Sequence, residues 1–112
     1  MTNYKNKRIS TEITRYVNSI ILKDIKDELI KSITIIDTEL NNDLSIARVF
    51  FTAISDLTHE ELENHVNESS SFIRGKLSKL INLRHTPEIL FVYDKSVEYG
   101  DKIEKLIKEI NK

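Results

Sequence analysis

The chain has no cysteine, no tryptophan, one proline and two glycines among its 112 residues. Without cysteine it cannot form a disulfide, a thiolate zinc site, a cysteine-ligated iron–sulfur cluster or a cysteine nucleophile. No apolar run approaches the roughly 18 residues that a membrane span requires. The basic N-terminus is not followed by the apolar segment of a signal peptide. We therefore expect a soluble protein of the cytoplasm.

The scarcity of proline and glycine also leaves no linker that would divide the chain. Hydrophobic residues make up 39% of the sequence and charged residues 31%. This composition can bury one core and argues against disorder. We expect a single domain over residues 1–112, with a flexible start at residues 1–6.

Catalytic and cofactor motifs are missing as well. The sequence contains no H-E-x-x-H, no phosphate-binding loop, no G-x-G-x-x-G and no G-x-S-x-G. His59 and His65 are spaced so that they do not share one helix face, and we expect both to be solvated. We therefore expect no enzymatic activity, no cofactor and no metal site.

Hydrophobic periodicity predicts the secondary structure. Three- and four-residue steps predict helices over residues 8–25, 72–83 and 97–110, and Thr58 with Glu61 has the spacing of a capping box that begins a helix over 58–68. Segments 32–40 and 46–54 have the composition of a strand hairpin, and the apolar run 88–94 suits a strand that is covered on both faces or lies at the centre of a sheet. The order α-β-β-α-α-β-α predicts an α+β domain with a three-stranded mixed sheet and helices mainly on one face.

Charge is distributed unevenly along the chain. The formal net charge is −1, yet residues 1–23 carry +4, residues 24–68 carry −8, residues 69–86 carry +4 and residues 87–112 carry −1. If the first helix and the 72–83 helix lie on the same side of the sheet, their basic residues form one patch that attracts phosphates. The alternative is two ordinary helices whose basic faces are solvated separately.

Several stretches resemble the bacterial ribosome-binding factor A family. LRHTPEILFVYD at residues 83–94 resembles the family signature L-R-x-x-P-E-[LI]-x-F-x-x-D. FIR at 72–74 and DLSIARV at 43–49 resemble its F-I-R and its D-L-x-x-A-[KR]-V hairpin, and IKD at 25–27 resembles the end of its first helix. Arg8, Ile9 and Ile13 fit its N-terminal helix. The similarity extends in order over residues 4–110.

This resemblance implies a type II KH-like fold and a role in ribosome biogenesis. Members bind the immature small (30S) ribosomal subunit and 16S rRNA, assist late rRNA processing, and are associated with cold adaptation. We expect a monomer with no membrane partner and no small-molecule substrate. A KH-like protein-interaction module and a general binder of single-stranded RNA are the alternatives, although the absence of G-x-x-G speaks against the second.

The sequence departs from the family at the junction of its central helices. Ser69, Ser70 and Ser71 stand where members have an A-x-G kink. Glycine adopts a positive φ without steric cost, whereas serine does so less freely. Whether the kink persists is therefore a question for the structure.

We expect the rRNA-binding surface to consist of basic side chains that contact phosphates. The candidates are Lys5, Lys7, Arg8, Arg15, Arg48, Arg74, Lys76, Lys79 and Arg84. A structural ion pair is the alternative role for Arg74, and a helix C-cap is the alternative role for Arg84. Phe72, Pro87 and Phe91 are interpreted as architectural, with the aromatic rings in the core.

Overall fold

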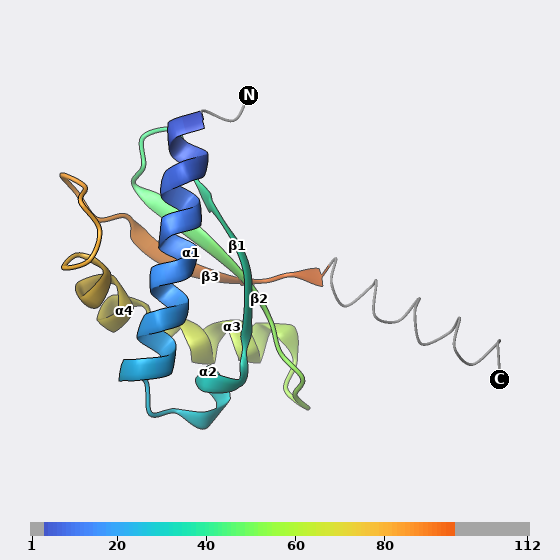
Figure 1. The fold of residues 1–112 in the computed structure, drawn as a ribbon. Coiled ribbons are helices and arrows are strands. Elements are labelled where there is room, and N and C mark those ends of the chain that lie inside the picture. The colour runs from blue at the N-terminus through green and yellow to red at the C-terminus, as the bar shows by residue number, and fades with distance from the viewer. Residues whose placement is uncertain (1–3, 96–112) are drawn as a thin grey trace, which may run out of the picture.

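The structure is a computed structural model that describes residues 4–95, with side chains from Asn6 onward (Figure 1). Its elements, in chain order, are α1 (Tyr4–Asp24), α2 (Glu28–Ser32), β1 (Thr34–Leu40), β2 (Ile46–Thr52), α3 (His59–Asn67), α4 (Ser70–Leu77) and β3 (Glu88–Tyr93). The predicted order is confirmed over this part of the chain, with one short helix added. The helix predicted over 97–110 lies outside the described residues.

The three strands form a mixed sheet in the order β1-β2-β3. β1 and β2 are antiparallel, and β2 and β3 are parallel. The predicted hairpin is therefore confirmed. Neither placement expected for residues 88–94 is observed. β2 is the central strand and β3 an edge strand, and Leu90 of β3 is 44% exposed, so the described residues do not cover both faces of β3.

Side chains of α3 occupy the free edge of β3. The Asn67 amide donates to the Phe91 carbonyl at 3.0 Å and accepts from the Phe91 N–H at 2.8 Å. Glu63 Oε1 accepts from the Tyr93 N–H at 2.9 Å. These contacts satisfy backbone groups that would otherwise be open to another chain. They explain how so apolar a strand is accommodated at an edge.

The helices lie on one face of the sheet, as predicted. α1 packs on β1, and α3 and α4 pack on β3 (Figure 1). Along β2, Ala47, Val49 and Phe51 are fully buried, and they alternate with residues that face solvent. On the opposite face Ile46 is 37% and Leu90 44% exposed, so the described part of the chain leaves this face open.

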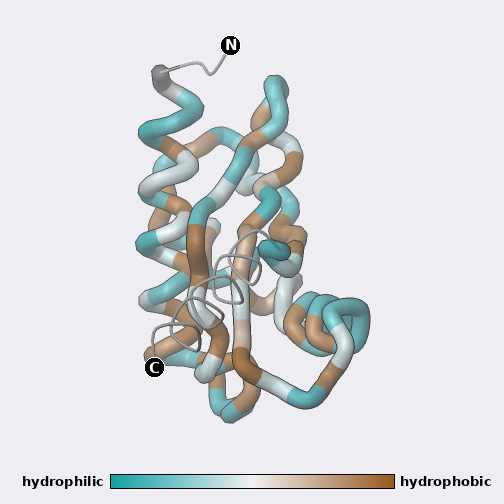
Figure 2. Tube along the Cα trace, turned by 90° about the vertical axis from the view of Figure 1, so that its right-hand side faces the viewer, coloured by the Kyte–Doolittle hydropathy of each residue, from teal (hydrophilic) through white to brown (hydrophobic). Residues whose placement is uncertain are grey.

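One apolar stripe of α1 forms much of the core. Figure 2 shows apolar and polar residues alternating along this helix, as one buried side requires. Its buried members are Ile9, Ile13, Val17, Ile20 and Ile21. In the sheet, the Phe51 ring meets Phe91 and Tyr93 edge-on, with centroids 6.3 and 5.7 Å apart. Among the described residues, no helix has the length and apolarity to cross a bilayer.

The junction between α3 and α4 is made without glycine. Ser69 has φ −92° and ψ −1°, and Glu68 before it has φ −59° and ψ −26°. Both are ordinary right-handed conformations, and Leu44 alone among the described residues has a positive φ. Ser69 makes no side-chain capping bond. The interruption is therefore a backbone turn at Glu68 and Ser69 that any residue can adopt, and Ser70 and Ser71 begin α4.

Two predictions about the segment after this junction are wrong. The helix predicted to reach residue 83 ends at Leu77, so Leu80, placed by the periodicity on the buried face, is 48% exposed. Phe72, interpreted as a core residue, is 46% exposed. Ile73 and Leu77 point at the sheet, and a residue one step from Ile73 is turned by about 100°. That rotation directs Phe72 outward.

Candidate nucleic-acid interface

A groove forms where α1, the β1–β2 turn, α4 and the loop before β3 meet. Its volume is about 890 Å³, and it is lined by Arg8, Arg74 and Arg84, among other residues. These arginines come from α1, from α4 and from the loop beyond α4. The structure therefore brings together basic residues from both +4 segments, as predicted for helices on one side of the sheet.

Arg74 has a structural role within this groove. Its Nε and Nη2 atoms donate to the Thr86 carbonyl at 3.2 and 2.9 Å. The alternative of a structural ion pair is thus replaced by a contact to a backbone carbonyl, which holds the loop against α4. A guanidinium has five N–H donors, so three remain for a ligand.

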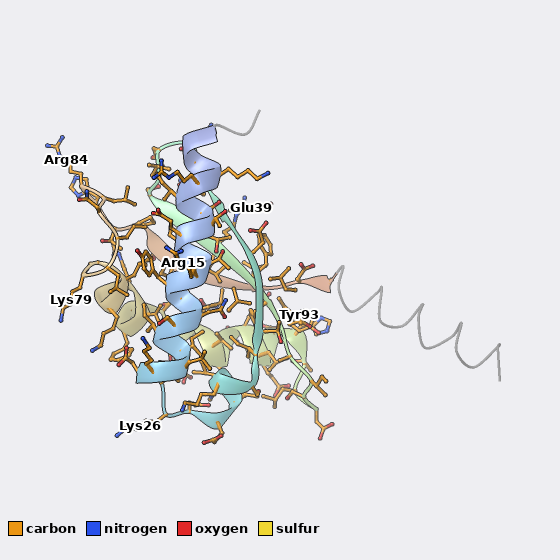
Figure 3. All side chains as sticks on the ribbon, in the orientation of Figure 1. Arg15, Lys26, Glu39, Lys79, Arg84 and Tyr93 are labelled. Carbon is orange, nitrogen blue, oxygen red and sulfur yellow. The ribbon has the colours of Figure 1, made fainter. Side chains whose placement is uncertain are left out.

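Arg84 lies on the loop beyond α4 and is exposed. The helix ends at Leu77, so Arg84 is not its C-cap. Figure 3 shows Arg84 and Lys79 projecting outward from the side of the molecule that α4 and this loop form. Both are placed to meet a ligand that lies along that side.

The β1–β2 turn places an acidic residue, Asp43, in the lining of the groove. The hydroxyl of Ser45, with its backbone N–H, holds the pKa of the Asp43 carboxyl below its ordinary value. Asp43 Oδ1 accepts from these groups at 2.7 and 3.1 Å. Leu44 between them has φ 61°, a strained conformation for a residue with a side chain. Asp43 is therefore a charged residue of the turn and opposes phosphate at this end.

Neither Arg15 nor Lys7, the described candidates that remain on α1, is among the residues that line the groove. Arg15 follows Arg8 by two helical turns and so lies on the same side, about 10 Å further along the axis. Its guanidinium carbon is 5.4 Å from the centroid of the Tyr16 ring. Lys7 is exposed. The Lys5 side chain lies outside the described residues.

Three other candidates are placed differently. Lys76 lies with its Nζ 5.5 Å from the Phe72 ring centroid, on the outer side of α4, and Lys79 is exposed just beyond the helix. Arg48 points to the open sheet face, where its Nη2 is 3.5 Å from Glu39 Oε2. Arg48 is thus the candidate that the fold separates from the groove.

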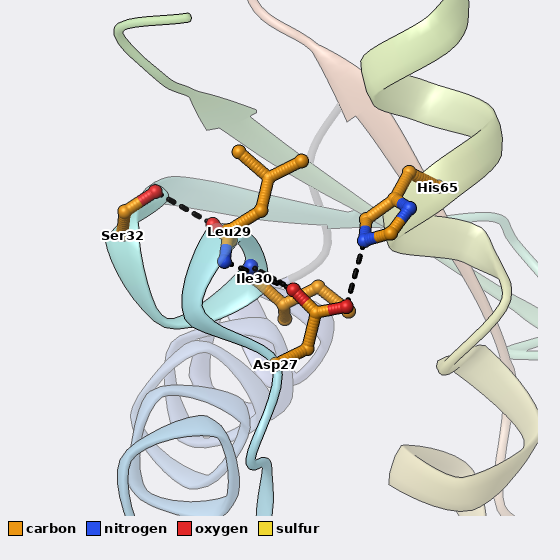
Figure 4. A network of polar contacts seen from close by, with 5 residues as sticks. All are labelled: Asp27, Leu29, Ile30, Ser32 and His65. Atoms are coloured by element: carbon orange, nitrogen blue, oxygen red, sulfur yellow. Dashed lines mark hydrogen bonds and ion pairs between the residues drawn. The ribbon is translucent and has the colours of Figure 1, made fainter.

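Polar contacts missed in the sequence connect α2 to α3 (Figure 4). Asp27 caps α2, with Oδ1 accepting from the N–H groups of Leu29 and Ile30 at 2.9 and 3.1 Å. Its Oδ2 is 2.8 Å from His65 Nε2. The Ile30 N–H first, and then His65, lower the pKa of the Asp27 carboxyl.

The expectation that both histidines are solvated is wrong, because His65 contacts Asp27 and His59 stacks on Tyr93 with ring centroids 4.0 Å apart.

Only the spacing of Asp27 before the apolar residues of α2 offered a signal for that cap. Nothing in the sequence pairs it with His65, which follows 38 positions later. In the part of the chain that the structure describes, no three histidine, aspartate or glutamate residues are grouped as a metal site requires.

Solved structures share this fold. The crystal structure of ribosome-binding factor A from Thermus thermophilus superposes with a TM-score of 0.69 at 16% identity, covering 80% of this chain and 97% of that chain. A homology model of the Thermus thermophilus protein, fitted into a cryo-electron microscopy map of its complex with the 30S subunit, has a TM-score of 0.63 at 14% identity, covering 80% and 96%. The α+β fold is therefore the KH-like fold of these proteins.

Sequence comparison extends the similarity to the whole chain. The family model described as ribosome-binding factor A matches residues 5–107. Ribosome-binding factor A of Enterococcus faecalis is 36% identical, over 99% of this chain and 97% of the relative. The Streptococcus mutans protein is 32% identical, over 100% and 98%. The chain belongs to the ribosome-binding factor A family.

Proposed function

We propose that this protein binds the immature 30S subunit through phosphates of 16S rRNA and assists late steps of its maturation. The observation that supports this most is the convergence of Arg8, Arg74 and Arg84 on one groove. Family membership gives the groove its context, since a Thermus thermophilus relative was fitted into a map of a 30S complex. The protein acts by binding, as a monomer in the cytoplasm, without catalysis or a cofactor.

Phosphate contacts suit this groove better than base reading does. Guanidinium groups bind phosphate oxygens through two parallel hydrogen bonds. Arginines on α1, on α4 and on the loop beyond α4 can contact successive phosphates along a curved RNA backbone. Each contact that neutralises a phosphate releases counterions, so affinity falls steeply with salt. Because the net charge of the whole chain is −1, nonspecific attraction to RNA is weak. The protein is therefore expected to bind a particle on which several phosphates are spaced to contact the arginines of the groove.

Depletion of the protein in cells tests the maturation role. We expect ribosome gradients to show fewer mature 30S subunits, and mapping of rRNA ends to show unprocessed 16S precursors, most strongly in the cold. Normal gradients and mature 16S ends in the cold would contradict the proposal. Restoring the wild-type chain from a plasmid is the control for indirect effects of depletion.

A filter-binding comparison tests the alternatives. We expect tighter binding to immature 30S particles than to free single-stranded RNA of the same sequence. Preference for the free strand would indicate a general single-strand binder. Binding to neither, with capture of a protein partner, would indicate an interaction module.

A further inference from the structure

Phe72 is an aromatic residue that α4 presents to solvent. It is 46% exposed, whereas Phe51 and Phe91 are among the most deeply buried side chains. Ile73 and Leu77 supply the buried contacts of α4. Phe72 is therefore a large apolar surface that the core does not use.

The surroundings of this ring are basic. The Lys76 ammonium lies 5.5 Å from the ring centroid, one helical turn away. Lys79 is exposed just beyond the end of α4. Residues 69–86 contain four basic residues and no acidic one. Phe72 is thus set in a positive segment of the surface.

The outer side of α4 is open beside the ring. Gly75 lies next to Phe72 on the helix surface, and a Cβ added there would meet nothing within 4 Å. Arg74 projects from the other flank of the helix, toward Thr86 and the groove. α4 therefore carries Arg74 on one flank and the Phe72–Lys76 pair on the other.

We propose that Phe72 stacks on an unpaired base of the bound RNA while Lys76 contacts a neighbouring phosphate. This inference rests on the proposed function and adds a base contact to the phosphate contacts of the groove. A nucleotide combines a flat aromatic face with a negative charge, which matches an exposed ring beside an ammonium group. An apolar protein pocket suits the pair less well, because it would strip water from Lys76 without a partner.

Tryptophan fluorescence tests the stacking. The chain has no tryptophan, so Phe72→Trp introduces a single tryptophan, which absorbs at longer wavelengths than the four tyrosines and can be excited without them. We expect its emission to be quenched by 30S subunits and by an unstructured oligoadenylate, but not by inorganic polyphosphate, which has no bases. Phe50→Trp on the open sheet face is the matched control and should not be quenched. An unquenched Phe72→Trp variant that binds 30S subunits with wild-type affinity would overturn the proposal.

Affinity measurements distinguish stacking from ordinary apolar contact. We expect Phe72→Leu to weaken 30S binding about five- to 150-fold, the range for loss of one base stack, while Phe72→Tyr binds nearly as well as wild type. Thermal unfolding should change little, because the ring is half exposed. Wild-type affinity in Phe72→Leu would show that the aromatic ring does not contribute to binding and would overturn stacking. Failure of the wild-type chain to bind 30S subunits would instead overturn the proposed function.

Discussion

Several polar side chains hold the local structure on which the groove depends. Arg74 holds the loop before β3 through the Thr86 carbonyl, and Asp43 accepts the hydroxyl and backbone N–H of Ser45 in the β1–β2 turn. Each therefore combines a charge with a positioning role. Substitutions that separate the two roles are more informative than alanine alone.

Arg74→Lys keeps the charge and removes the fork of two N–H donors. We expect the amides of residues 82–86 to exchange hydrogen faster and the free energy of unfolding to fall by about 1 kcal/mol. Hydrogen-exchange mass spectrometry and urea titration measure the two effects. Lys79→Arg, at an exposed position, is the control and should leave both unchanged. Unaltered exchange in Arg74→Lys would show that the Thr86 contact does not hold the loop.

Asp27→Ala removes the cap of α2 and the partner of His65. We expect a loss of about 1 kcal/mol of stability at neutral pH, as for other N-caps. Because folding lowers the pKa of this carboxyl, its stabilisation is present above the ordinary value of 3.8 and is lost as pH falls through the native pKa. Urea unfolding of both proteins at pH 7 and pH 3 should show the difference shrinking in acid. An equal difference at both pH values would mean that the carboxylate charge contributes nothing.

At the scale of elements, long periodic segments were predictable and short ones were not. The stripe of α1 continues from Ile9 to Ile21, more than three turns, so the helix and its buried face follow from spacing alone. α2 has only five residues, and its formation depends on the Asp27 cap and on α3 packing nearby. α4 stops at Leu77 although the apolar spacing continues to Ile81, because the chain must turn back toward β3.

The candidate site was predictable in composition but not in arrangement. The two basic segments and most arginines of the groove can be read from the sequence. Which of them meet depends on how the helices and loops pack on the sheet. Arg48 is separated from Arg8 and Arg84 because it alternates with the buried Ala47 and Val49 and so points to the opposite face of the sheet. The exposure of Phe72 depends on how α4 is rotated about its axis against the sheet. Residues 72 and 73 are both apolar, so the sequence of this short helix does not say which of the two faces the core.

The contact between α3 and β3 gives a prediction for an element. Asn67→Ala leaves the N–H and carbonyl of Phe91 without their partner, and we expect a loss of about 2 kcal/mol in the free energy of unfolding. Asn64→Ala, at an exposed position of the same helix, is the matched control and should cost less than about 0.5 kcal/mol. Equal losses from the two substitutions would contradict the role of Asn67 at the sheet edge.

For the whole molecule, the near-zero net charge conceals a polarised surface. The two +4 segments meet at the groove, while much of the negative charge lies in residues 24–68, which include the hairpin and α3. We expect the logarithm of the 30S binding constant to fall linearly with the logarithm of salt concentration. Affinity that does not change between low and high salt would indicate an apolar interface instead.

The groove itself is tested most directly by 30S binding of a double variant, Arg8→Gln with Arg84→Gln, measured by cosedimentation. Its control is Lys26→Gln with Lys31→Gln, which removes the same charge at the opposite end of the molecule, where Figure 3 places Lys26. We expect the groove variant to bind at least about tenfold more weakly, with a salt slope smaller by about two, and the control to bind as wild type. Equal affinities of the two variants, both folded, would contradict the assignment of the groove as the rRNA-binding site.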